Sequence, residues 1–330
     1  MDMRIPVQHG LQFLFDSYQR KGVWEEFLTL AGPGTNWVSA YIACQLVLID
    51  DEKAHELRKK VWHKLSGSRM FLKQSKWGFN SRVPADADST IWVLLLASQL
   101  GIEPSRQSKS YAFIRRHIQS NGGISTYKDD RMIRLFTKLK KNISFAGWCH
   151  DHTCVTAAAL SLPELADENM IRYLLDQQQG NGAWPAYWWV TSAYSTGLIA
   201  EGFCRLNNNM PEKKLSDAVE QSVNWSIQKL RSSRSFLPFE LSYLLRILKC
   251  GDEQKCAYWI EYVLDELISL QSPDGSWESS ALLRIPFPHT IDPATIMNWN
   301  WQGKGGGCII QDHNRCFTTA SVLYSLSLYL

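Results

Sequence analysis

The chain has 330 residues, of which 45% are hydrophobic, so it can bury a large core in one or two domains. Its net charge is only +3, with 35 basic and 32 acidic residues, which gives no electrostatic case for nucleic-acid binding. The longest unbroken apolar run, residues 91–97, is too short to span a bilayer.

The cysteines and the first residues of the chain indicate its compartment. Eight cysteines are scattered without Cys-x-x-Cys spacing, and residues 1–10 lack the apolar stretch of a secretory signal. Both features favour a cytoplasmic protein with reduced thiols. Contact with a membrane, if any, is then expected to be peripheral.

Two kinds of helix alternate along the chain. An amphipathic helix is predicted over residues 11–30, and the clearest of five more covers residues 257–270. Six other segments open with polar or small residues and continue as nearly unbroken apolar runs, which is typical of helices buried on most sides. These six lie at residues 35–48, 88–100, 152–162, 191–203, 239–248 and 315–328.

This alternation predicts an all-α fold. Six buried and six amphipathic helices suggest an inner ring of six within an outer ring of six, an (α/α)6 barrel. Strand signals are sparse, and no linker interrupts the pattern, so residues 1–330 are expected to form a single domain. The basic stretch 128–141 is predicted to be a surface excursion.

A Gln–Gly–Trp pattern recurs between the helices. The clearest copies run from Gln178 to Trp184 and from Gln271 to Trp277, and weaker or decayed ones begin at Gln74, Gln119 and Gln228. We expect the glutamine to cap a helix end, the glycine to form a left-handed C-cap and the tryptophan to stack over the glutamine. The pattern would then pin one helix pair to the next.

Two acidic residues stand where the buried helix 88–100 begins, in the sequence Asp86-Ala87-Asp88-Ser89-Thr90. A carboxylic acid at such a place can be kept protonated by burial and oriented by a neighbour, as general acid catalysis requires. Residues of the same type also serve as simple helix caps. Spacing alone leaves both interpretations open.

The repeats resemble the QW motifs of the class II terpene cyclases, the superfamily of squalene–hopene and oxidosqualene cyclases. Residues 86–90 are similar to their Asp-x-Asp-Asp-Thr acid motif, with Ser89 in place of the third Asp. The length matches one of the two barrels that these enzymes usually have, as in the rarer single-domain members. The resemblance implies that Asp88 protonates an alkene of a linear polyprenyl or prenylated aromatic substrate, a meroterpenoid precursor, to give a polycyclic isomer. Asp86 would set the geometry of Asp88, and no cofactor or metal would be needed.

The carbocation formed in this way needs stabilisation without a nucleophile, which aromatic faces provide. Trp188, Trp189 and Trp299 are the first candidates, since each lies in a segment flanked by Gly or Pro. Most aromatic residues of a helical barrel would nevertheless be plain core. The further substrate-binding candidates are Tyr194, Trp92 and Trp37, followed by Tyr41, Trp148 and Trp301.

The segment 148–152 carries two histidines and a cysteine. His152, or His150, is expected to bond to the catalytic acid and later return its proton. Cys149 and His150 also allow a zinc-dependent enzyme on the same barrel, similar to lanthionine cyclases or protein prenyltransferases, with a further ligand such as Cys308 or Cys316.

Two further alternatives stand beside these. A non-catalytic isoprenoid-binding barrel would keep the glutamine motifs but have no use for the paired acids. A magnesium-dependent class I synthase is disfavoured because Asp50-Asp51 and Asp129-Asp130 lack a third carboxylate. The expected partner is thus a small-molecule isoprenoid, and residues 303–307 and 128–141 are candidate lids over its cavity.

Overall fold

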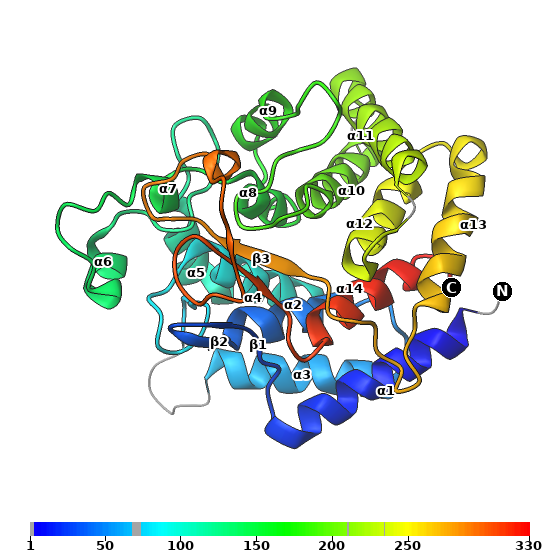
Figure 1. Ribbon diagram of the computed structural model, residues 1–330, viewed down its shortest axis with the longest axis horizontal. Coiled ribbons are helices and arrows are strands. Elements are labelled where there is room, and N and C mark those ends of the chain that lie inside the picture. The colour runs from blue at the N-terminus through cyan, green and yellow to red at the C-terminus, as the bar shows by residue number, and fades with distance from the viewer. Residues whose placement is uncertain (1–2, 68–73, 210, 234) are drawn as a thin grey trace.

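The computed structural model describes residues 3–67, 74–209, 211–233 and 235–330 and is mostly helical (Figure 1). The α-helices are α1 (Arg4–Lys21), α2 (Asn36–Gln45), α3 (Glu52–Ser66), α4 (Ala87–Gln99), α5 (Ser108–Arg115), α6 (Arg131–Thr137), α7 (Ala146–Cys149), α8 (Thr153–Ala159), α9 (Glu168–Asp176), α10 (Ala193–Asn209), α11 (Lys213–Ser232), α12 (Pro238–Lys249), α13 (Glu253–Ser269) and α14 (Cys316–Ser327). The 3-10 helices are η1 (Pro104–Gln107) and η2 (Pro293–Thr295), and the strands are β1 (Glu26–Thr29), β2 (Gly32–Gly34), β3 (Leu282–Ile285), β4 (Asn300–Trp301) and β5 (Cys308–Gln311).

The six helices predicted as buried are all present, as α2, α4, α8, α10, α12 and α14. Each contacts the next in this order, and α14 contacts α2 again. A second layer packs on them: α3 on α2 and α4, α5 on α4, α9 on α8, α11 on α10, α13 on α12 and α1 on α14. The buried helices are apolar on most sides because they have helical neighbours on most sides.

The tryptophans of the repeats join each outer helix to the inner helix that follows it. The Trp184 indole donates a hydrogen bond to Leu174 O in α9, and its backbone N–H donates to the Thr196 hydroxyl on α10. Two other tryptophans repeat both bonds, Trp77 with Leu65 and Thr90, and Trp277 with Leu267 and Thr319. The tryptophan therefore bonds to the backbone of the outer helix and to a hydroxyl of the inner helix.

In the two clearest repeats, the glutamine and the glycine join neighbouring outer helices. The Gln178 amide donates to Gly182 O within its own loop and to Ala218 O in α11. Gly182 has φ +93° and packs on that helix so closely that a Cβ would lie 2.3 Å from Gln221 O. The predicted C-cap was wrong for this glycine, because α9 already ends at Asp176 and the glycine turns the loop that follows. Gln271 and Gly275 make the same contacts with α1.

Short strands were not predicted, and one of them replaces helix. The first helix was expected over residues 11–30, but α1 ends at Lys21, where Gly22 adopts a left-handed conformation, and residues 26–29 form β1. β1 pairs antiparallel with β2, while β5 pairs antiparallel with β3 and parallel with β4. No helix among the described residues is long and apolar enough to cross a membrane.

Candidate active site

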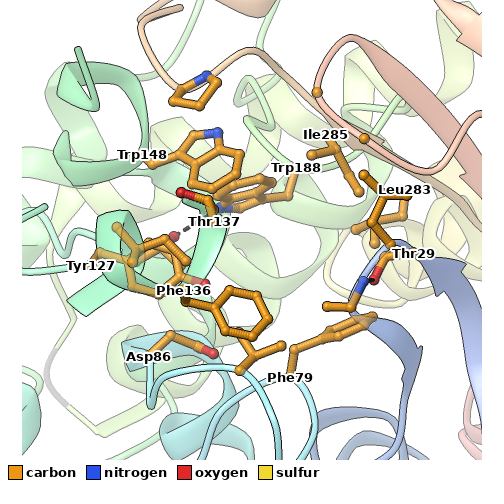
Figure 2. A pocket seen from close by; sticks show the side chains of 18 of the residues that line it. Thr29, Phe79, Asp86, Tyr127, Phe136, Thr137, Trp148, Trp188, Leu283 and Ile285 are labelled. Carbon is orange, nitrogen blue, oxygen red and sulfur yellow. Dashed lines mark hydrogen bonds between the residues drawn. The ribbon is translucent and has the colours of Figure 1, made fainter. Parts of the chain in front are cut away.

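A cavity of about 540 Å³ opens where the inner helices α2 and α4 begin (Figure 2). Its walls come from the β1–β2 turn, the first residues of α2 and α4, helix α6, strand β3, and residues 287–288 and 304–306. The lining is largely apolar and rich in rings: Trp37, Phe79, Tyr127, Phe136, Trp148, Trp188 and Phe287. Its polar side chains are Thr29, Asp86, Asp88, Ser89, Thr126, Thr137 and Lys304.

Asp86 is the N-cap of α4 and is almost fully buried. Its carboxylate accepts hydrogen bonds from the backbone N–H of Ser89 at 2.7 Å and from the Ser89 hydroxyl at 2.9 Å. Burial raises the pKa of Asp86 to about 7, although both hydrogen bonds favour the ionised form. The capping interpretation is therefore confirmed for this residue, and catalytic positioning remains compatible with it.

Asp88 lies in the first turn of α4 and reaches the cavity, while its Oδ1 atom is enclosed. Burial, and then the nearby charge of Asp86, raise the pKa of Asp88 well above its ordinary value. The surroundings of Asp88 therefore favour its protonated, neutral form. The indole groups of Trp92, one turn further along α4, and Trp37 act in the opposite direction and lower this pKa.

Three buried polar atoms beside the acid have no hydrogen-bond partner among the described residues. They are Oδ1 of Asp88 and the indole Nε1 atoms of Trp37 and Trp92. Unpaired buried polar groups are rare in folded proteins and call for an explanation. Here the two indole donors approach the carboxyl group closely enough to lower its pKa, although neither reaches full hydrogen-bond geometry.

His152 does not bond to either acid. Its Nε2 atom lies 2.8 Å from Gly147 O, and its Nδ1 atom lies 2.8 Å from the Thr126 hydroxyl. The same hydroxyl accepts a hydrogen bond from the Trp188 indole at 2.8 Å. Burial lowers the pKa of His152 to about 3, so the ring is neutral. Both ring nitrogens are already used, which is why the expected bond to Asp88 is absent.

The structure brings some of the predicted aromatic residues to the cavity and places others behind it. Trp37, Trp148 and Trp188 line the cavity. Trp92 is buried next to Asp88 and packs edge-on against Tyr41. Trp189 and Tyr194 are buried in the core and stack on each other with ring centroids 4.6 Å apart. Trp299 is half-buried in the loop before β4, outside the lining, and Trp301 is 59% exposed.

Several lining residues escaped the sequence analysis. Phe136 belongs to the basic stretch 128–141, which was predicted only as a surface excursion and candidate lid. Ile133, Phe136 and Leu139 recur there at helical spacing and all reach the cavity, so this apolar stripe was a usable signal. Residues 304–306 of the other candidate lid also line the cavity.

Cys149 and His150 do not form a metal centre with other side chains. His150 is half exposed and contacts Asp151, while burial raises the pKa of the Cys149 thiol to about 11. Cys308 is buried in β5, and Cys316 contacts Ser17. Across the described ranges, no three His, Cys, Asp or Glu side chains are placed to hold a metal ion together.

Neither a protein-family model nor a curated protein sequence matches the chain. Among solved structures, the type II terpene cyclase MstE from Scytonema matches it with a TM-score of 0.90 and 32% sequence identity, over 99% of this chain and 98% of that one. The chain belongs to the type II, or class II, terpene cyclases. The terpene cyclase predicted from the sequence is thereby confirmed.

Other solved structures resemble this chain to different degrees. MstE variants have been solved with the substrate geranylgeranyl dihydroxybenzoate, at TM-score 0.89 and 32% identity to this cyclase, and with the product merosterolic acid A, at TM-score 0.90 and 32% identity. The ent-copalyl diphosphate synthase from Streptomyces platensis matches at TM-score 0.61 and 16% identity, over 95% of this cyclase but 53% of that enzyme. That second likeness shows a common fold only.

Proposed function

We propose that this cyclase converts a linear prenylated aromatic acid into a polycyclic isomer, and that Asp88 starts the reaction. The observation that carries the proposal is an enclosed carboxyl group, with its pKa raised by burial and by Asp86, in the wall of an apolar, ring-lined cavity. The complexes of MstE with geranylgeranyl dihydroxybenzoate and merosterolic acid A support this class of substrate and product.

The first step breaks the O–H bond of Asp88 and forms a C–H bond at an alkene of the prenyl chain, which leaves a tertiary carbocation. Further double bonds then supply electron pairs for ring closure, and loss of one proton ends the cascade without change of formula. The apolar lining excludes water, which would otherwise capture the cation.

We assign Trp37 and Trp92 to the acid rather than to the cation. Their N–H groups lie beside Asp88 without full hydrogen-bond geometry and favour its ionised form, and a carboxylate appears there only after the proton has left. Donors that are already oriented toward a developing charge stabilise it without reorganisation. Asp86 fixes the start of α4 through its two bonds to Ser89 and so holds Asp88 in place.

The cation itself would meet the rings of the cavity wall. Trp188 and Trp148 lie next to each other there, with ring centroids 6.0 Å apart (Figure 2). Each cation–π contact is worth about 0.5–2 kcal/mol, depending on desolvation. Trp189 lies behind the lining residue Trp37, with ring centroids 5.9 Å apart, and stacks on Tyr194, so these two rings would act from behind the cavity wall. Trp299 would take no direct part.

The architecture that we propose for residues 1–330 is a single (α/α)6 barrel with QW motifs. The closed series of contacts from α2 through α14, and the outer helix on each member, support the barrel. The bonds of Gln178 and Trp184, repeated at Gln271 and Trp277, support a common motif.

The decisive experiment is cyclisation of geranylgeranyl dihydroxybenzoate by the purified Asp88→Asn variant. Asparagine has nearly the same shape but no acidic proton, so we expect loss of at least about 1,000-fold in kcat. The matched control is Asp167→Asn, another aspartate at a helix start, which caps α9. Chromatography with mass spectrometry would detect a product of unchanged mass. Full activity of Asp88→Asn would exclude Asp88 as the acid.

We also propose peripheral contact with a membrane at the cavity mouth. Leu30, on the β1–β2 turn, is 80% exposed and lines the cavity together with Lys304. Leu135, on α6, is 73% exposed, and Lys138 directly follows that helix. Apolar side chains with nearby cations suit an anionic lipid surface. Leu135→Glu should reduce co-sedimentation with phosphatidylserine vesicles several-fold, whereas Tyr258→Glu on outer helix α13 should not. Equal binding by both variants would contradict the proposal.

A further inference from the structure

A directed series of hydrogen bonds ends at the cavity wall. The Trp188 indole N–H donates to the Thr126 hydroxyl. That hydroxyl donates its own proton to Nδ1 of His152. The other ring nitrogen, Nε2, then carries the histidine proton and donates to Gly147 O. A neutral imidazole fits this series, because it offers one acceptor and one donor on opposite sides of its ring.

The far end of the series is fixed to the mouth of the cavity. His152 stacks on Tyr187 with ring centroids 3.9 Å apart, and the Tyr187 hydroxyl donates to Thr290 O. Gly147 donates its backbone N–H to Pro288 O and packs so tightly on Thr290 that no side chain fits between them. The histidine is thus held on its face by stacking and on its edge by hydrogen bonds, against the loop 286–290.

The near end of this hydrogen-bond series is the Trp188 indole. Trp188 is half-buried, and its indole could turn about its side-chain bonds if its N–H lost its acceptor. Thr126 also contacts α4, because its backbone carbonyl accepts the backbone N–H of Ala87 at the start of that helix. One residue therefore connects the wall that faces the cation to the helix that carries the acid.

We propose that Thr126 and His152 are positioning residues, which hold the Trp188 ring in the orientation that stabilises the later cations of the cascade. The inference rests on the function proposed above. Loss of the orientation should leave substrate binding and the first protonation largely intact. The later cations would be less stabilised, so more molecules would lose a proton before the last ring closes.

The test compares products rather than rates alone. Thr126→Val removes the hydroxyl at nearly constant volume, and with geranylgeranyl dihydroxybenzoate it should raise the share of partially cyclised isomers at least about fivefold, with KM changed less than about twofold. Thr126→Ser restores the hydroxyl and should restore the product ratio. The matched control is Thr196→Val, which removes a buried hydroxyl from a structural bond outside the cavity and should leave the ratio unchanged.

A second variant guards against misfolding of the first. Trp188→Phe removes the same hydrogen bond from its other end, so the double variant should change the ratio no more than the stronger single variant. Independent, additive changes would overturn the inference, and so would a normal product ratio in Thr126→Val. If Asp88→Asn stays active, the proposed function fails as a whole. If Asp88→Asn is inactive but Thr126→Val cyclises normally, only this inference fails.

Discussion

The raised pKa of Asp88 suits proton transfer, but it also means that ionisation of this residue destabilises the folded protein. Its carboxyl group lies among rings and beside Asp86, and both surroundings raise its pKa well above the ordinary value. The folded chain therefore binds a proton that the unfolded chain releases above the ordinary carboxyl range. The contribution of Asp88 to the free energy of unfolding therefore falls as pH rises from that range toward the raised pKa.

This sign leads to a prediction at one residue. Asp88→Asn cannot ionise, so the variant should unfold at a higher Tm than the parent, by roughly 2 °C or more at pH 8 and by less at pH 5. Thermal unfolding followed by circular dichroism at both pH values measures the difference. Asp167→Asn is the control and should show no such gain. An equal gain at both pH values would mean that ionisation of Asp88 is not what costs stability.

The residues of the site were predictable to different degrees. Asp86 and Asp88 could be located because a polar start followed by an apolar run fixes where a buried helix begins. The partners of His152 could not, since Thr126 and Gly147 belong to loops whose approach depends on packing across the ring. Trp188 and Trp189 are adjacent, and the sequence does not tell which of them faces the cavity.

At the scale of the helices and the loops between them, hydroxyl groups on the inner helices bind the repeat loops, a role that the sequence analysis missed. Besides Thr196, the hydroxyls of Thr90 and Thr319 on the inner helices accept the backbone N–H of the repeat tryptophans. Thr156 accepts that of Ile124, at the repeat that has no tryptophan. The hydroxyl is therefore present even in the repeat without a tryptophan. This hydrogen bond is thus a regular part of the contact between a repeat loop and the inner helix that follows it.

Thr196→Val should therefore destabilise the protein although it barely changes the volume of the core. It leaves the buried N–H of Trp184 without an acceptor, which costs about 1–3 kcal/mol. Chemical denaturation would measure the loss, with Thr295→Val on an exposed 3-10 helix as the control. A change of stability equal to that of the control would show that the contact between this repeat loop and α10 does not depend on the hydrogen bond.

Helices and strands differed in how well the sequence predicted them. Long apolar runs specify a buried helix locally, and all six inner helices appeared within a few residues of their expected starts. The strands have only two to four residues, too few for an alternating pattern to show. Their pairing also depends on segments far apart, such as β3 with β5.

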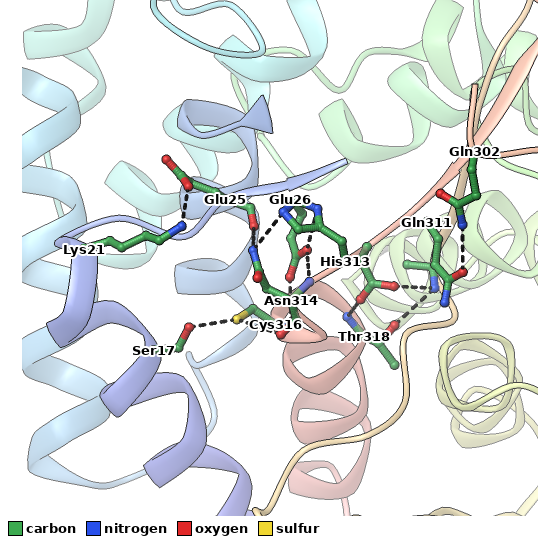
Figure 3. A network of polar contacts seen from close by, with 12 residues as sticks. Ser17, Lys21, Glu25, Glu26, Gln302, Gln311, His313, Asn314, Cys316 and Thr318 are labelled. Atoms are coloured by element: carbon green, nitrogen blue, oxygen red, sulfur yellow. Dashed lines mark hydrogen bonds and ion pairs between the residues drawn. The ribbon is translucent and has the colours of Figure 1, made fainter. Parts of the chain in front are cut away.

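At the scale of the whole molecule, a second pair of buried carboxyl groups joins the N-terminal and C-terminal parts of the chain (Figure 3). Glu26 of β1 accepts the backbone N–H groups of Asn314 and Cys316 at the start of α14. Asp312 accepts the backbone N–H of Thr318 in the same helix. Burial, and then the charge of Asp312, raise the pKa of Glu26 well above its ordinary value.

Glutamine and alanine at this position should therefore behave differently. Glu26→Gln keeps one acceptor oxygen but turns an NH2 group toward the second backbone N–H, so it should lose part of the stability that Glu26→Ala loses. Glu26→Ala leaves two buried N–H groups unpaired and should lose about 2 kcal/mol or more. Glu25→Ala removes a neighbouring carboxylate that pairs with Lys21 at the surface, and its expected loss is about 1 kcal/mol or less. Chemical denaturation of the three variants compares them, and equal losses for Glu26→Gln and Glu26→Ala would contradict this account.

The enclosed oxygen of Asp88 has a consequence for the whole cascade in the mechanism proposed here. Once the proton has left, the acid becomes the counter-ion of the cation that it created. Two unit charges 4 Å apart attract by about 4 kcal/mol at an effective dielectric constant of 20, and half of this is lost when their separation doubles. Every ring that closes moves the positive charge along the chain and away from its counter-ion. The aromatic wall must therefore replace an attraction that weakens with each ring, so where the rings lie relative to Asp88 sets how far the charge can travel.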